Sequence, residues 1–199
     1  GVECSPARII ISSGTEYLLQ LLIQLLDESA RYAIENPGYE RISQLFKSNR
    51  VDFTPMDLDD QGVRPDDLEH KMVDVVCITP SHQFPTGCIM PVTRRLQLLG
   101  WAAARPGRYI IEDDYDSEFR YSGKPIPSLQ GMDRSDRVIY VGSFSKSLSP
   151  ALRISYMVLP EHLVPAFDER LHFLNCAVPM IDQKILAQFI NKGHFERHL

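Results

Sequence analysis

Short apolar runs alternate with segments of helical periodicity along most of the chain, and this alternation limits the possible fold more than any other feature. Strands are predicted from the apolar runs at residues 8–11, 32–35, 51–55, 73–79, 108–111, 138–141 and 154–158. Helices are expected at about residues 16–26, 39–47, 64–68, 91–104, 160–174 and 180–192. This order is typical of β-α-β units, so the sequence predicts one α/β domain, a three-layer α/β/α sandwich around a mostly parallel sheet.

The composition agrees with a globular domain that has its own core, since 44% of the 199 residues are hydrophobic and 24% are charged. The net charge of −5 gives no overall electrostatic case for binding nucleic acid, and the basic pair Arg94-Arg95 is expected on a solvated helix face. Four cysteines without CxxC or metal-ligand spacing favour a reducing, cytoplasmic location. The sequence contains no signal peptide and no apolar stretch of about 18 residues, so it gives no indication of secretion or membrane insertion.

The ends of the chain are abrupt. An apolar run begins almost at once after residue 6, and the chain stops at residue 199 while its pattern still indicates a helix. We therefore expect residues 1–199 to be a fragment of a longer protein.

A lysine follows one predicted strand in the stretch 142–146, GSFSK. A neutral lysine amine can form an imine with an aldehyde, and nearby positive charge favours the neutral amine. Ser143 and Arg153, which is seven residues beyond Lys146, offer hydrogen-bond donors to a phosphate. The stretch therefore suits a phosphorylated aldehyde, although a lysine in a serine-rich loop is more often merely solvated.

Acidic residues crowd the end of another apolar strand, in the stretch 112–116, EDDYD. Like charges this close need a cation nearby. A protonated pyridine nitrogen would supply one to Asp113, and the phenol of Tyr115 can reach the neighbouring oxygen of such a ring. Carboxylates at a strand end can also hold Mg²⁺, but no glycine-rich phosphate loop accompanies them, so a metal site ranks well below.

Two further stretches add to this interpretation. Gly14 and Thr15 lie at a strand-to-helix junction, where free N–H groups and a hydroxyl can bind an anion, although such residues usually only cap the helix. Tyr39 follows a tight turn, where its ring can stack on a cofactor or simply pack in the core.

Together these stretches resemble the class I and II aminotransferases, and more closely the effector domain of MocR/GabR-type regulators in the GntR superfamily. Three segments are similar to that family almost letter for letter, namely 79–87 (TPSHQFPTG), 111–121 (IEDDYDSEFRY) and 142–146 (GSFSK). The resemblance covers essentially the whole chain. It implies the large domain of a fold type I pyridoxal-phosphate (PLP) protein.

The resemblance also implies a role for each matching residue. Lys146 would hold PLP as a Schiff base, and Asp113 would pair with the pyridine nitrogen. Tyr115 would bond the phenolic oxygen, and Tyr39 would stack on the ring. The phosphate would be bound by Gly14, Thr15, Ser143 and Arg153.

The chain also departs from the aminotransferase pattern. Aminotransferases usually have an asparagine where this chain has Phe84, whose side chain cannot hydrogen-bond the phenolic oxygen, and this weakens the case for a conventional transaminase. His82 either replaces that contact or is only structural. The family's N-terminal winged helix-turn-helix is not visible in residues 1–199, nor is the C-terminal small domain that carries an arginine for the effector's carboxylate.

The resemblance implies a homodimeric regulator in which PLP on Lys146 forms an aldimine with an amine or amino-acid effector. This exchange would bias attached DNA-binding domains. Two alternatives stay open. One is a true aminotransferase acting on an amino acid and a 2-oxo acid, and the other is a sensor of PLP itself that controls vitamin B6 synthesis.

Overall fold

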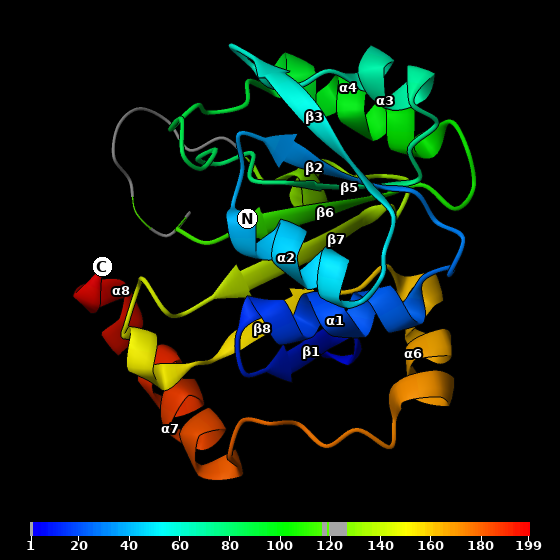
Figure 1. Cartoon of the computed structure of the whole chain (residues 1–199). Helices are drawn as coiled ribbons and strands as arrows, with labels where there is room; N and C mark the ends of the chain where they lie inside the picture. The colour runs from blue at the N-terminus through cyan, green and yellow to red at the C-terminus, as the bar shows by residue number, and fades with distance from the viewer. Residues whose placement is uncertain (1, 117–118, 120–126) are drawn as a thin grey trace.

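The computed structural model describes residues 2–116, 119 and 127–199, and in these residues the strands form one sheet with the order β1-β8-β7-β6-β5-β2-β3-β4 (Figure 1). The strands are β1 (Ile9–Ser12), β2 (Tyr32–Asn36), β3 (Phe53–Asp59), β4 (Gly62–Val63), β5 (Val75–Ile78), β6 (Tyr109–Asp114), β7 (Val138–Ser143) and β8 (Ser155–Val158). The α-helices are α1 (Thr15–Leu25), α2 (Glu40–Ser48), α3 (Pro65–His70), α4 (Val92–Ala103), α5 (Leu129–Met132), α6 (Val164–Leu171), α7 (Met180–Asn191) and α8 (His194–His198). Three short 3-10 helices are η1 (Pro6–Arg8), η2 (Pro150–Leu152) and η3 (Glu161–Leu163).

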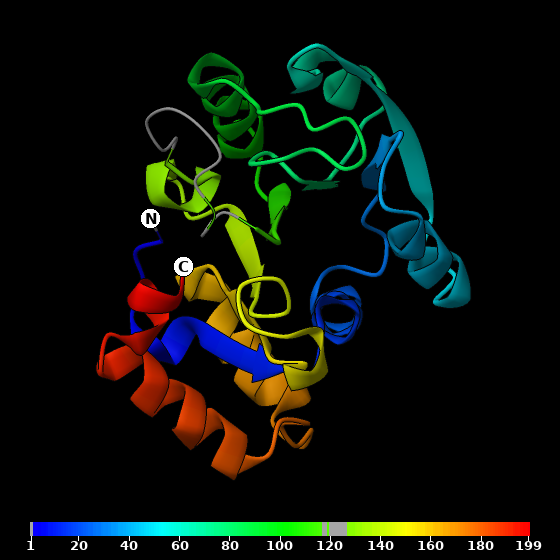
Figure 2. The ribbon, with the colours of Figure 1, turned by 90° about the vertical axis from the view of Figure 1, so that its left-hand side faces the viewer.

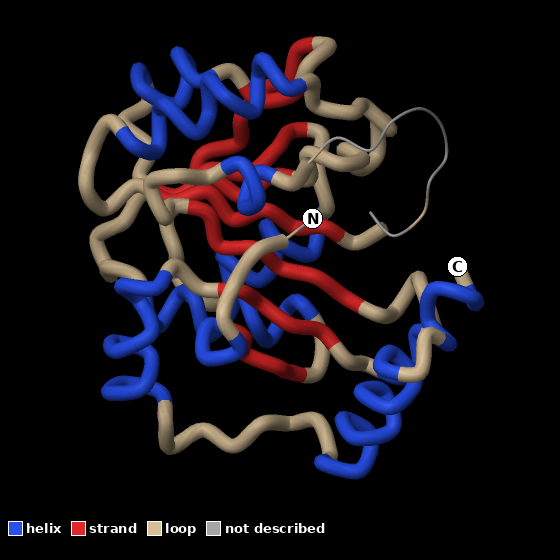
Figure 3. Tube along the Cα trace, turned by 180° about the vertical axis from the view of Figure 1, so that it is seen from behind, coloured by secondary structure: helices blue, strands red, loops and turns tan. Residues whose placement is uncertain are grey.

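The sheet is mixed but mostly parallel, which confirms the predicted α/β class. Strands β3, β2, β5, β6 and β7 run parallel to one another, whereas β8 is antiparallel to both β7 and β1, and β4 is antiparallel to β3. Seen from behind, the strands form one continuous layer between helices (Figure 3). Because β8 runs the opposite way, its first residue lies at the same edge as the last residues of β1 and β7.

Each face of the sheet is covered by its own helices, so there are two hydrophobic cores. On one face α1, α2 and α6 bury residues such as Leu22, Phe46 and Leu171. On the other face α3, α4 and α5 bury Leu68 and Leu98 among others. A view turned by 90° shows α1 and α2 on one side of the strands and α4 on the other (Figure 2). The result is the predicted three-layer sandwich.

Several predicted boundaries differ from the structure. The strand expected at 51–55 is β3, Phe53–Asp59, because it pairs with β2 in a register that runs from Phe53 to Asp57. The helix expected at 160–174 begins as the 3-10 turn η3 and becomes α6 only at Val164, ending at Leu171. Neither β4 nor α5 was predicted, since segments of two and four residues carry almost no periodicity.

The prediction of a solvated face for Arg94-Arg95 was wrong, because both side chains are buried. Arg94 forms an ion pair with Asp59 at 2.7 Å. Arg95 donates hydrogen bonds to backbone carbonyls and lies 3.6 Å from the carboxylate of Glu112. The two guanidiniums thus fasten α4 to neighbouring segments.

Two kinds of feature are absent from the described residues. None of their helices combines the length and the hydropathy that crossing a bilayer requires. In the same part of the chain, no three His, Cys, Asp or Glu side chains are grouped so that they could hold a metal ion.

Candidate functional site

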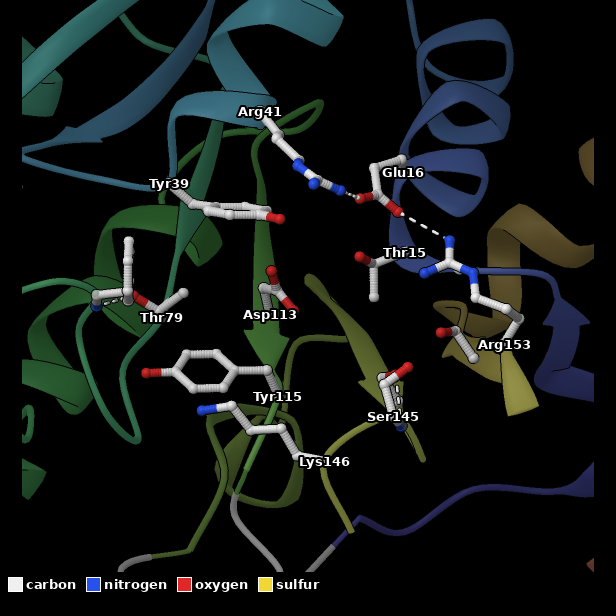
Figure 4. A pocket seen from close by; sticks show the side chains of 14 residues that line it. Thr15, Glu16, Tyr39, Arg41, Thr79, Asp113, Tyr115, Ser145, Lys146 and Arg153 are labelled. Carbon is white, nitrogen blue, oxygen red and sulfur yellow. Dashed lines mark hydrogen bonds and ion pairs between the residues drawn. The ribbon is translucent and has the colours of Figure 1, made fainter. Parts of the chain in front are cut away.

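A cavity of about 280 Å³ opens at the carboxyl edge of the parallel strands (Figure 4). Its wall is built from the segments that follow β1, β2, β5, β6 and β7 and from the segment that precedes β8. The residues that line it are Gly14, Thr15, Glu16, Tyr39, Arg41, Thr79, Phe84, Asp113, Tyr115, Ser143, Ser145, Lys146, Arg153 and Ser155. Every residue predicted for the site lines this cavity except His82.

One end of the cavity gathers hydrogen-bond donors around the start of α1. Gly14 has a φ of +96°, and a Cβ built there would lie 2.2 Å from Nη2 of Arg153. Glycine is therefore required for the guanidinium to approach the beginning of the helix this closely. The Oγ of Ser143 accepts a hydrogen bond from the backbone N–H of Ser145 at 3.1 Å. A helix N-terminus, hydroxyls and a guanidinium together supply the donors that a phosphate prefers.

The carboxylate of Asp113 projects into the middle of the cavity from the end of β6 (Figure 4). Its Oδ1 is buried and has no hydrogen-bond partner among the described residues. Burial, reinforced by the negative charges of Asp114, Glu35 and other nearby carboxylates, raises the pKa of Asp113 to about 7. In the part of the chain that the structure describes, this carboxylate oxygen is thus unpaired, which fits a ligand that brings a cationic N–H.

The side chains of β6 alternate as the strand pattern predicts. Asp113 faces the cavity, whereas Asp114 accepts a hydrogen bond of 2.8 Å from the hydroxyl of Tyr140 on the neighbouring strand β7. Of these two adjacent carboxylates, only that of Asp113 therefore faces the cavity.

Lys146 lies across the cavity from Asp113, in the loop after β7 (Figure 4). Its Nζ is 4.2 Å from the centroid of the Tyr115 ring and 3.6 Å from Oδ2 of Asp116. The side chain is 54% exposed, so the amine is accessible to a molecule that enters the cavity. A primary amine in this position can form an imine with an aldehyde.

Two aromatic rings form another part of the wall. Tyr39, at the beginning of α2, meets Phe84 edge to face, with ring centroids 5.9 Å apart. Phe84 is 47% exposed and offers no hydrogen bond from its side chain. The ring of Tyr39 lies above Asp113 in Figure 4, where a planar ligand held by that carboxylate would meet it.

His82 is the predicted site residue that the structure does not place on the cavity wall. Its Nδ1 lies 3.1 Å from Oδ1 of Asp116, and its backbone carbonyl accepts a hydrogen bond of 2.8 Å from the hydroxyl of Tyr115. His82 therefore holds the side chains of Tyr115 and Asp116 in position without lining the cavity itself.

A row of charged side chains at the mouth of the cavity was not predicted from the sequence. Glu16 accepts a hydrogen bond from Arg41 at 3.3 Å and lies 3.5 Å from Arg153 (Figure 4). Burial raises the pKa of Glu16, but hydrogen bonds and the charges of both arginines outweigh it and lower that pKa overall. No motif marks these residues, although Glu16 directly follows Thr15 and Arg41 comes two residues after Tyr39.

Part of one family-like segment lies outside the described residues. Of the stretch 111–121, residues 117–118 and 120–121 are not described. The predicted site residues Asp113 and Tyr115 are described in full.

An open, mostly parallel sheet with a lysine in a cavity at its carboxyl edge is the architecture of the fold type I transferases. The sequence pattern of the family "Aminotransferase class I and II" matches residues 1–198. The chain therefore belongs to the class I and II aminotransferase family.

Curated relatives that match over the whole chain include transcriptional regulators. The chain is 45% identical to "Uncharacterized HTH-type transcriptional regulator YdeL" of Bacillus subtilis (strain 168), covering 100% of this chain and 43% of the relative. It is 38% identical to "Probable rhizopine catabolism regulatory protein MocR" of Rhizobium meliloti, covering 100% and 40%. It is 34% identical to "HTH-type pyridoxine biosynthesis transcriptional regulator PdxR" of Corynebacterium glutamicum, covering 99% and 43%. The chain thus spans about two fifths of the length of these relatives.

Solved structures of aminotransferases share the fold. The multiple substrate aminotransferase of Thermococcus profundus is 32% identical and superposes with a TM-score of 0.84, covering 96% of this chain and 49% of that chain. The predicted resemblance to class I and II aminotransferases and to MocR-type regulators is confirmed.

Proposed function

We propose that this chain is the PLP-binding effector domain of a transcriptional regulator. The observation that carries the proposal is the buried Oδ1 of Asp113, which has no partner in the described residues and lies in the same cavity as Lys146 and the donor-rich end at Gly14. An isolated buried carboxylate is costly, so its presence at this point favours a ligand that supplies an N–H. PLP has a basic ring nitrogen, an aldehyde and a phosphate, one for each of these three positions.

The residues on the cavity wall would each hold one part of PLP. Lys146 would bond the aldehyde carbon, Asp113 would keep the ring nitrogen protonated, and Tyr39 would cover the ring. Tyr115 would contact the phenolic oxygen with the hydroxyl that the carbonyl of His82 orients. The phosphate would lie at the end formed by Gly14, Thr15, Ser143 and Arg153. Bound in this way, PLP supplies a reactive carbon for primary amines and a ring that withdraws electrons.

The regulatory part of the proposal rests on the relatives. All three are named as regulatory proteins, and two of them are named as HTH-type transcriptional regulators. We infer that residues 1–199 are the large domain of a longer, homodimeric protein that binds DNA through an N-terminal helix-turn-helix. An amine or amino acid that replaces Lys146 on PLP would then be the effector. The coupling free energy between effector and operator is the quantity that defines such a regulator.

Two other functions have support of their own. The relative named for pyridoxine biosynthesis favours a sensor whose ligand is PLP itself. The likeness to the Thermococcus profundus enzyme favours catalytic turnover, which Phe84 in the usual place of an asparagine argues against.

One experiment separates these functions. The full-length protein is purified, loaded with PLP, and titrated with candidate amines and amino acids while visible absorbance and affinity for its own promoter are measured. An effector-responsive regulator changes both signals with the amine and forms no 2-oxo acid. A PLP sensor changes DNA affinity with PLP alone, and an aminotransferase forms 2-oxo acid repeatedly.

A further inference from the structure

A second buried carboxylate, that of Asp116, lies next to Lys146 and has no role in the proposed binding of PLP. Its side chain is only 6% exposed. The two carboxylate oxygens point to different partners. Oδ1 lies 3.1 Å from Nδ1 of His82, and Oδ2 lies 3.6 Å from Nζ of Lys146.

The amine of Lys146 is in contact with two groups that favour a positive charge. The carboxylate of Asp116 attracts an ammonium directly, and the face of the Tyr115 ring, 4.2 Å from Nζ, attracts a cation through its quadrupole. Neither group favours the neutral amine that must bond an aldehyde carbon. The arrangement is therefore suited to lysine when it is not bonded to the cofactor.

Exchange with an effector produces this unbonded lysine. The effector nitrogen, after it has given up one proton, would form a bond to the carbon that Lys146 held, and the bond from that carbon to Nζ would break. Two protons pass from the effector nitrogen to Nζ, so Lys146 leaves as an ammonium and no electrons are gained or lost. The charge on the departing lysine then needs a partner within the cavity.

We propose that Asp116, oriented by His82, is the docking site for the Lys146 ammonium after an effector has displaced it. Asp116 is a positioning residue that favours the exchanged state. This inference rests on the proposed function, because it requires that Lys146 bonds PLP. His82 contributes twice, since its ring orients Asp116 and its backbone carbonyl holds the hydroxyl of Tyr115, the other group that Lys146 contacts.

The test uses the full-length protein and the variant Asp116→Asn, which keeps the shape of the side chain and removes its charge. Methylamine is the probe, because it is a primary amine with no other functional group. In the PLP-loaded protein, absorbance titration gives the methylamine concentration at half exchange, which we expect to rise roughly two- to fivefold in the variant, the range of a partly exposed ion pair. In the PLP-free protein, the rate of PLP capture at Lys146 should rise by a similar factor, because the lysine side chain no longer has to leave an ion pair before it reaches the aldehyde carbon.

Weaker exchange together with faster capture distinguishes docking from a structural role, since a damaged site would lose both exchange and capture. His82→Ala leaves the backbone carbonyl in place and should shift both readouts in the same directions by a smaller factor. Asp136→Asn is the matched control, because it removes an ion-paired carboxylate at the opposite edge of the sheet and should change neither readout.

Two results would overturn the inference while the proposed function stands. These are a wild-type adduct on Lys146 with both readouts unchanged in Asp116→Asn, and the same adduct with weaker exchange and slower capture in that variant. A wild-type protein that gives no borohydride-reducible PLP adduct at Lys146 would overturn the proposed function together with the inference.

Discussion

Replacing Asp113 by asparagine is expected to stabilise the PLP-free chain at alkaline pH while weakening its hold on PLP. The carboxylate is buried, and its Oδ1 has no partner among the described residues. Asparagine has nearly the same shape and no charge. The substitution therefore isolates the free-energy cost of an ionised carboxylate at this position.

The magnitude follows from the pKa of Asp113, which burial and neighbouring carboxylates raise from 3.8 to about 7. A pKa raised by about 3 corresponds to about 4 kcal/mol. Because the folded state keeps its proton where the unfolded state has lost it, the wild-type free energy of unfolding falls as the pH rises between about 4 and 7. It loses nothing more above that window. The asparagine amide also lacks a partner, which costs about 1–3 kcal/mol, so we expect a net gain of about 1–3 kcal/mol at pH 9 and no gain near pH 4.

The measurement is urea unfolding of the PLP-free chain at pH 4.5, 7 and 9, followed by circular dichroism. Asp60→Asn serves as the control, because Asp60 is exposed and its removal should leave the pH dependence unchanged. Titration with PLP at pH 7.5 should show weaker binding to Asp113→Asn. A variant that is less stable than the wild type at every pH, or more stable by the same amount at every pH, would show that the charge of Asp113 carries no such cost.

The other predictions concern the lysine, the phosphate end and DNA. Lys146→Ala should abolish the PLP adduct that borohydride fixes, as detected by mass spectrometry, and an adduct that persisted would assign the bond to another amine. Gly14→Ala should lower the affinity for inorganic phosphate at least tenfold by isothermal titration and cost about 1–3 kcal/mol in stability, because its backbone conformation excludes other residues and a Cβ would overlap Arg153. Glu16→Gln should raise phosphate affinity about two- to fivefold by freeing Arg153, and unchanged affinity would mean that Glu16 does not compete for that side chain. The 199-residue chain alone, with a net charge of −5, should not retard promoter DNA in a mobility-shift assay, and sequence-specific retardation would contradict this.

Much of the fold was accessible from periodicity, and one missed feature could have been found. The apolar runs and amphipathic segments predicted the order of strands and helices, and the last residues of parallel strands meet at one edge of the sheet. The antiparallel direction of β8 was not predicted. Residues 144–154 between β7 and β8 contain no α-helix long enough for a parallel crossover, so the loop length itself indicates an antiparallel neighbour.

Features that depend on partners from several elements were not accessible in this way. The pair Arg94-Arg95 is typical of a solvated helix face. Both side chains can be buried only because Asp59 and Glu112 lie close to them in the folded chain. The link from Arg41 to Glu16 joins residues 25 positions apart on two helices, and a pattern within one helix cannot show it. By contrast, the roles of Asp113 and Tyr115 were implied by the family resemblance, and alternation along β6 turns Asp113 rather than Asp114 toward the cavity.

Under the proposed function, the charges around the cavity would let the domain respond to its ligand. Among the described residues, the buried Oδ1 of Asp113 has no partner, the two arginines at the mouth share the single carboxylate of Glu16, and Lys146 contacts Asp116. A ligand with a cationic N–H at one end and a phosphate at the other would pair with Asp113 and with the arginines at the same time. Any ligand that binds only the folded domain stabilises it by an amount that grows with the ligand concentration relative to its dissociation constant. An effector that also moves Lys146 onto Asp116 would change which contacts the cavity wall makes. A difference of about 1–3 kcal/mol between these two states, the usual coupling between sites, would change DNA affinity about 5- to 150-fold.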